Sequence, residues 1–90
     1  MNGFYEWDPN KEDASTHGVA FGSAEGFEWE TAFEIRDTRR AYAEVRTIAL
    51  GFIADRLHVM VFNRRAEKVR IISLRKANRR EITRYVELTK

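Results

Sequence analysis

The 90-residue sequence contains no cysteine and only two histidines. The absence of cysteine excludes disulfide bonds and cysteine-ligated metal sites. His17 and His58 are far apart in the chain and have no carboxylates at ligand spacing, so no metal site is predicted. The sequence also lacks a glycine-rich phosphate loop before a helix and a Ser/His/Asp pattern, and nothing else in it predicts a bound cofactor.

Long apolar runs are missing as well. No segment approaches the roughly 20 apolar residues that span a bilayer. Residues 1–13 are acidic and aromatic and lack the apolar core of a signal peptide. We therefore expect a soluble cytoplasmic protein without a membrane partner. The length predicts a single domain over residues 1–90.

The net charge of +2 hides an uneven distribution. Residues 1–63 carry six Lys and Arg against eleven Asp and Glu, whereas residues 64–90 carry ten against three. A basic C-terminal third predicts a polyanionic partner such as nucleic acid. The alternative is that folding brings the two parts together as ordinary surface ion pairs.

The apolar pattern predicts an α+β fold, a small antiparallel meander of about four strands with two short N-terminal helices and one C-terminal helix. The predicted strands of the meander are residues 31–36, 44–52, 57–62 and 69–74. A further short strand is expected at residues 4–7. The two N-terminal helices are expected at residues 8–16 and around Ser23, and the last helix follows Asn78.

Three local patterns give sharper expectations. Residues 57–62 are apolar on both faces except for His58, which predicts a central strand with a core histidine. Alternation in the next strand places Val69, Ile71 and Ser73 opposite Arg70, Ile72 and Leu74. Asn78 and Glu81 form a capping box. In the helix that follows, the predicted core-facing residues are Ile82, Tyr85 and Val86.

Arginine is the residue type that indicates a function. Arg65, Arg70 and Arg75 are spaced by five, and Arg46 precedes them in the neighbouring predicted strand. The planar guanidinium matches phosphate, and fixed cations stabilise the charge that develops when the 2′-hydroxyl of RNA attacks the adjacent phosphate. The alternative is a solvated strand face, with its arginines paired to Glu34, Glu44 and Glu67.

Four ordered segments add a resemblance. They are Glu6-Trp7-Asp8 with Lys11; His17-Gly18-Val19 with Phe21 and Ala24; Arg70-Ile71-Ile72-Ser73-Leu74-Arg75-Lys76-Ala77; and Arg80-Glu81 with Tyr85. Together they resemble the BrnT family, the toxins of type II toxin–antitoxin pairs. The resemblance covers nearly the whole chain, and its most specific part is the pattern RIISxRKA.

The resemblance implies a RelE-like fold and metal-independent endoribonuclease activity on cellular RNA that inhibits translation and growth. It also implies neutralisation by a BrnA-like antitoxin with a ribbon-helix-helix domain, in a toxin–antitoxin heterotetramer. The expected catalytic residues are His17, Glu44, Arg46, Arg65 and Arg75. The expected RNA-binding residues are Arg64, Arg70, Ser73, Lys76 and Arg79. Within these sets, Arg65 and Arg75 are the expected phosphate clamp, and His17 or Glu44 is the expected general base or acid.

The chain departs from the family pattern at three places. The segment from Lys11 to His17 is apparently two residues shorter than in the family and lacks its Asn and Lys. Asn63-Arg64-Arg65 replaces a T-E-R motif, and residues 41–44 read AYAE in place of DYGE. These departures keep a second hypothesis open, a catalytically weak or inactive module that binds nucleic acid or an antitoxin.

Overall fold

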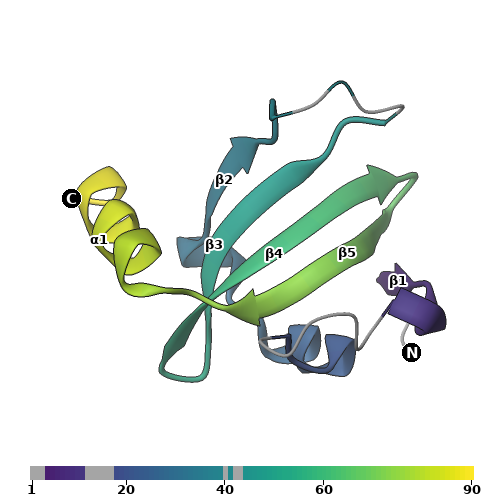
Figure 1. Ribbon diagram of the computed structural model, residues 1–90. Coiled ribbons are helices and arrows are strands. Elements are labelled where there is room, and N and C mark those ends of the chain that lie inside the picture. The colour runs from purple at the N-terminus through teal and green to yellow at the C-terminus, as the bar shows by residue number, and fades with distance from the viewer. Residues whose placement is uncertain (1–3, 12–17, 40, 42–43) are drawn as a thin grey trace.

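The computed structural model describes residues 4–11, 18–39, 41 and 44–90, and these form one mixed α+β unit around a twisted five-stranded sheet (Figure 1). The strands are β1 (Tyr5–Trp7), β2 (Phe33–Arg36), β3 (Thr47–Ile53), β4 (Arg56–Arg65) and β5 (Lys68–Lys76). The helices are the 3₁₀ segments η1 (Pro9–Lys11), η2 (Phe21–Gly26) and η3 (Trp29–Thr31), and the α-helix α1 (Arg79–Leu88). No helix among the described residues is long and apolar enough to cross a membrane.

The predicted α+β class is therefore confirmed, but its details need correction. The sheet has five strands in the order β1-β5-β4-β3-β2, rather than about four. The described N-terminal helical segments are short 3₁₀ turns, because Gly22 and Gly26 interrupt the apolar spacing of η2. The rest of the first predicted helix, residues 12–16, lies outside the described residues.

Strand β4 is the middle strand of the sheet, as its sequence predicts. It pairs antiparallel with β3 on one side and with β5 on the other. Its apolar side chains are buried on both faces, with Leu57 and Val59 on one and Met60 and Phe62 on the other. His58 is a core histidine, also as predicted, and its Nδ1 donates to the backbone carbonyl of Arg56 at 2.8 Å.

The outer strand β1 pairs parallel with β5. Tyr5 lies opposite Val69 and Trp7 opposite Ile71, although more than 60 residues of chain separate them. The Tyr5 hydroxyl accepts a hydrogen bond from Trp29 Nε1 at 2.7 Å. This bond joins β1 to η3. The predicted meander is thus closed at one edge by a parallel strand.

A β-bulge interrupts the β4–β5 ladder. Val61 lies opposite Ser73, but the next residue, Phe62, lies opposite Ile71, so Ile72 is the extra residue. A bulge shifts the alternation of the strand by one residue. As a result Leu74 lies in the buried cluster with Ile71, and the alternation expected for residues 69–74 is wrong.

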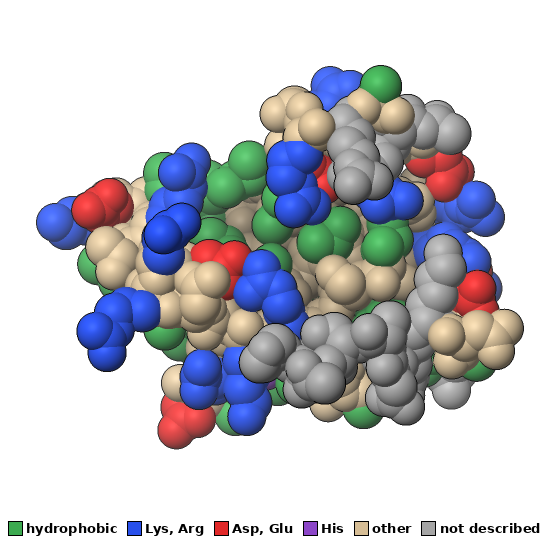
Figure 2. Space-filling view, viewed as in Figure 1, with side chains coloured by type: hydrophobic (Ala, Val, Ile, Leu, Met, Phe, Trp, Pro, Cys, Tyr) green, Lys and Arg blue, Asp and Glu red, His purple; other side chains and the backbone are tan. Residues whose placement is uncertain are grey.

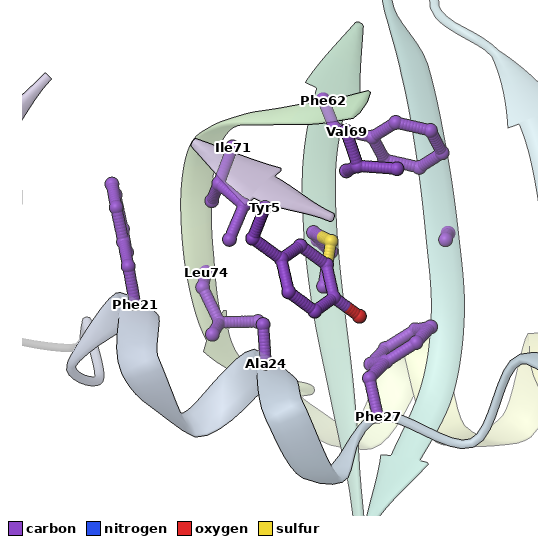
Figure 3. Close-up of a cluster of buried hydrophobic side chains, with 10 residues drawn as sticks. Tyr5, Phe21, Ala24, Phe27, Phe62, Val69, Ile71 and Leu74 are labelled. Carbon is purple, nitrogen blue, oxygen red and sulfur yellow. The ribbon is translucent and has the colours of Figure 1, made fainter. Parts of the chain in front are cut away.

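The two faces of the sheet are covered by different parts of the chain. The first, here called the N-terminal face, packs under η2 and the residues after it (Figure 3). Its buried side chains are Tyr5, Phe21, Ala24, Phe27, Ala49, Met60, Phe62, Val69, Ile71 and Leu74. The second, here called the helix face, is covered by α1 at one end only, where Tyr85 packs with Leu50, Leu57 and Val59.

Helix α1 begins with the predicted capping box, in which Asn78 and Glu81 each bind the other's backbone N–H at 2.9 Å. Only Tyr85 is buried, and its hydroxyl donates to the Thr31 carbonyl at 2.6 Å. Ile82 and Val86 are 39% and 50% exposed, so the expectation that they face the core is wrong. Helix α1 therefore reaches the core through Tyr85 alone among its residues.

The close approach of Phe27 to Gly51 gives a test of the N-terminal face. A Cβ at residue 51 would clash with the Phe27 ring. Gly51→Ala should lower the free energy of unfolding by about 1–3 kcal/mol through overpacking. Gly22→Ala is the control, because nothing lies within 4 Å of its Cβ position. Urea unfolding of both variants measures the difference; equal stabilities would contradict this packing.

Candidate active site

The β-bulge places three predicted site residues on the helix face. Arg75 lies opposite Val59 and Ser73 opposite Val61, and beyond the bulge Arg70 lies opposite Asn63. Without the extra residue, Arg70 would point to the N-terminal face, since successive side chains alternate. The helix face therefore presents Arg70, Ser73 and Arg75 along one strand.

The structure separates the two arginines of the expected phosphate clamp. Arg65 pairs with Lys68 beside the β4–β5 turn, whereas Arg75 lies opposite Val59, six residues further along β4. Six residues of strand span about 20 Å. One phosphate cannot contact both side chains, so the expectation of a single Arg65–Arg75 clamp is corrected.

Glu44 is the centre of a group at the hairpin end of the helix face. Its Oε1 accepts from Arg65 Nε at 3.2 Å, and its Oε2 accepts from Arg65 Nη2 at 3.3 Å and from Asn63 Nδ2 at 3.0 Å. We call Glu44, Arg46, Asn63, Arg65 and Arg70 the hairpin-end cluster. It brings together three predicted catalytic residues, one predicted RNA-binding residue and Asn63.

The connection from β2 to β3 positions Glu44 and Arg46. Both precede β3, which starts at Thr47, so the strand predicted from residue 44 begins later than expected. Asp37 closes the connection, because its backbone N–H donates to the Arg46 carbonyl at 2.8 Å. Its buried carboxylate accepts from Arg39 at 2.8 and 2.9 Å.

A pocket of about 160 Å³ opens within the hairpin-end cluster. Its lining residues are Asp8, Glu44, Arg46, Asn63, Arg70, Ile71 and Ile72. The half-buried Arg70 side chain has no hydrogen-bond or carboxylate partner in the part of the chain that is described. A guanidinium held beside a carboxylate in a small pocket can both bind phosphate and place an acid–base group near it.

Sequence reasoning missed Asn63. It is only 7% exposed and holds Glu44 from the end of β4. The signal was present in the alternation of Val59, Val61 and Asn63, which puts the amide on the same face as two apolar residues. The predicted strand instead ended at residue 62, which left Asn63 outside it.

A second basic group lies at the opposite end of the helix face. Arg75 donates to both carboxylate oxygens of Glu81, at 2.8 and 2.7 Å. This hydrogen bonding lowers the pKa of Glu81 and raises that of Arg75. Beside the pair lies a groove of about 670 Å³, lined by Gly18, Val19, Arg56, Arg75, Lys76, Ala77 and Asn78.

The remaining predicted site residues do not join either group closely. Arg64 points to the N-terminal face, where it pairs with Glu34 at 3.1 Å and lies over the Phe62 ring. Arg79 is an exposed residue at the start of α1. His17 lies outside the described residues.

Figure 2 shows one side of the molecule, where separate Lys and Arg side chains surround apolar ones and acidic side chains lie beside some of them.

The comparison with known families decides the relationship. Residues 7–81 match the family of the ribonuclease toxin BrnT of type II toxin–antitoxin systems. The chain belongs to the BrnT family. This match contains every described member of the hairpin-end cluster. Neither a curated protein nor a solved structure matches the chain.

Membership of the BrnT family connects the chain to RNA as a target and to an antitoxin as a partner. In the described part of the chain, no three His, Cys, Asp or Glu side chains gather to hold a metal ion. Asn63, which departs from the T-E-R motif that the resemblance implied, binds Glu44 through its Nδ2.

The Arg75–Glu81 pair predicts a pH-dependent stability. Glu81→Gln keeps a capping side chain but removes the charge. Because the pKa of Glu81 is lowered below its usual 4.5, the pair stabilises the fold above pH 4.5 and is lost as the pH falls through the lowered pKa. At pH 7 the free energy of unfolding of the wild type should exceed that of Glu81→Gln by under about 1 kcal/mol.

Urea unfolding at pH 7 and at pH 3 measures this difference, with Glu87→Gln on the exposed side of α1 as the control. Glu81→Ala should be less stable than Glu81→Gln by up to about 1 kcal/mol, because it also loses the cap. If the difference in free energy of unfolding between wild type and Glu81→Gln were larger at pH 3 than at pH 7, the stabilising role of the Arg75–Glu81 ion pair would be contradicted.

Proposed function

We propose that this BrnT-family protein is an endoribonuclease toxin that cleaves RNA at the hairpin-end cluster without a metal ion. The observation that carries the proposal is the Glu44 carboxylate, held by Arg65 and Asn63 in a pocket that also contains Arg46 and Arg70. An acid–base group and several fixed cations within one small site are what RNA transesterification requires.

Glu44 is the proposed general base. It takes the proton of a 2′-hydroxyl, whose oxygen attacks the adjacent phosphorus while the bond to the 5′-oxygen breaks. Arg46, Arg65 and Arg70 meet the negative charge that builds on the phosphoryl oxygens. The leaving 5′-oxygen takes a proton from a general acid, for which His17 remains the candidate from the sequence. The products are a 2′,3′-cyclic phosphate and a 5′-hydroxyl end.

RNA binding would extend along the helix face beyond the cleavage site. Arg56 and Lys76 line the groove next to Arg75, at the other end of the β4–β5 ladder. Cations at both ends of one face suit a single strand whose successive phosphates follow β5. Arg75 would then act in binding and in anchoring α1 through Glu81, rather than in phosphoryl transfer.

The proposed partner is a BrnA-like antitoxin with a ribbon-helix-helix domain, assembled with the toxin as a heterotetramer. A cell that carries such a ribonuclease must keep its basic face from cellular RNA. Carboxylates of a partner would pair with the arginines of the helix face and steer association. The exposed Ile82 and Val86 on α1 offer an apolar anchor beside that face.

Cleavage by arginine variants tests the proposed site. Arg70→Ala and Arg65→Ala should each slow cleavage of a labelled RNA by about 10²–10³, the usual effect of removing one preorganised donor to a developing oxyanion. Arg→Lys should restore only part of the rate, because an ammonium lacks the two-pronged contact. Arg84→Ala is the control, as an exposed cation on α1.

The assay is run in EDTA, and the 3′ end of the product is analysed for a cyclic phosphate. Loss of activity in EDTA that Mg²⁺ restores would contradict metal-independent cleavage. Full activity in both the Arg65 and Arg70 variants would place the site elsewhere. Wild-type protein that binds RNA but does not cleave it would instead support the alternative of a binding module.

Antitoxin masking has its own test. Hydrogen exchange of the toxin, alone and with the protein encoded by the neighbouring reading frame, should show protection of β4, β5 and α1 in the complex. These strands and this helix carry the basic side chains of the helix face. Protection confined to residues 25–34, with the hairpin end still exchanging, would contradict inhibition by masking.

A further inference from the structure

The amide of Asn63 is only half satisfied. Its Nδ2 donates to Glu44 Oε2 at 3.0 Å, and a carboxylate oxygen can only accept, so the amide orientation is fixed. Its Oδ1 is buried, and no described group donates a hydrogen to it. Leaving a buried acceptor without a donor is unfavourable, because the atom has lost its hydrogen bonds to water, so such an atom requires an explanation.

The same pocket contains a second incompletely satisfied group. Arg70 lines it, and no carboxylate or hydrogen-bond acceptor in the described part of the chain pairs with its side chain. A guanidinium in a partly desolvated site favours a planar or tetrahedral oxyanion. The pocket thus lacks one hydrogen-bond donor and one anion, and both would come from a single ligand.

We propose that this pocket binds the ribose 3′-phosphate unit of RNA, with the phosphate on Arg70 and the 2′-hydroxyl donating to Asn63 Oδ1. On a ribose, the hydroxyl and the phosphate sit on adjacent carbons, so one unit supplies both missing groups. DNA lacks the hydroxyl. The volume of about 160 Å³ is below that of pockets for whole drug-sized ligands, which suits a sugar and phosphate with the base outside.

The charges around the pocket are compatible with an anion. Its carboxylates are those of Asp8, which already accepts from the backbone N–H of Asn10 at 3.0 Å, and of Glu44, which is paired with Arg65. Arg70, which lines the same pocket, then opposes the phosphate charge. Because Oδ1 is covered, the proposal requires that a side chain of the pocket wall turns aside when the ligand binds.

This inference rests on the proposed function, because it names the substrate unit that the proposed site recognises. It also explains why Asn63 holds Glu44. The amide would place the carboxylate of the general base beside the same 2′-hydroxyl, whose single proton would turn from Oδ1 in the bound state to Glu44 when cleavage begins. The two proposed contacts read the sugar and the phosphate of the unit.

The test is binding of small nucleotides that have no diester to cleave. Adenosine 3′-monophosphate, its 2′-deoxy analogue and inorganic phosphate are titrated into the ¹⁵N-labelled protein in EDTA and followed by NMR. The ribonucleotide should bind about 2- to 10-fold more tightly than the deoxynucleotide, the factor of one hydrogen bond. Shifts should centre on Asn63 and Arg70.

Two variants separate the two contacts. Asn63→Leu should bind both nucleotides equally, while Arg70→Ala should weaken all three ligands; Arg84→Ala should match wild type. Equal affinity of wild type for the two nucleotides would overturn the proposal and leave Oδ1 to a bound water, and so would the absence of nucleotide binding. The comparison in wild type stands even if Asn63→Leu fails to fold.

This result is independent of the cleavage assay. Protein that cleaves RNA but does not distinguish the two nucleotides would refute the ribose site and leave the proposed function standing. Protein that prefers the ribonucleotide but does not cleave RNA would refute the ribonuclease proposal and leave the ribose site standing.

Discussion

The antiparallel ladder between β4 and β5, interrupted once at Ile72, is the constraint on which the rest of the structure depends. It buries the middle strand on both faces and supplies the edge to which β1 is added. The single extra residue keeps Leu74 in the core while it turns Arg70 to the helix face. A strictly regular strand could not do both, because its side chains alternate without a break.

The charged groups on the helix face are arranged around two carboxylates. Glu44 pairs with Arg65 at the hairpin end, and Glu81 pairs with Arg75 beside α1. The arginine has a different role in each pair. Arg65 orients the Glu44 carboxylate, which shares a pocket with other cations, whereas Arg75 links β5 to α1 through Glu81. Arg70 lies in that pocket without a described carboxylate partner.

Local chemistry made part of this structure predictable. The central strand followed from a run that is apolar on both faces, and the cap from Asn78 and Glu81 three residues apart. The parallel pairing of β1 and the bulge at Ile72 depend on contacts between distant segments, which no short pattern records. The spacing of five through Arg65, Arg70 and Arg75 suggested that these arginines are neighbours, but the hairpin places Arg65 and Arg75 at opposite ends of the ladder. The sequence predicted pairing of these arginines with Glu44 only under the alternative of a solvated strand face, and not as part of a phosphate-binding site.

The central claim is that Glu44, fixed by Asn63 and Arg65, performs the proton transfer in RNA cleavage. Single-turnover cleavage by Glu44→Gln tests it most directly, because glutamine keeps the shape of the side chain but does not accept the proton. The account predicts a thermal unfolding midpoint close to that of wild type and a rate about 10²–10⁴ lower. A folded Glu44→Gln protein that cleaves RNA at the wild-type rate would contradict it.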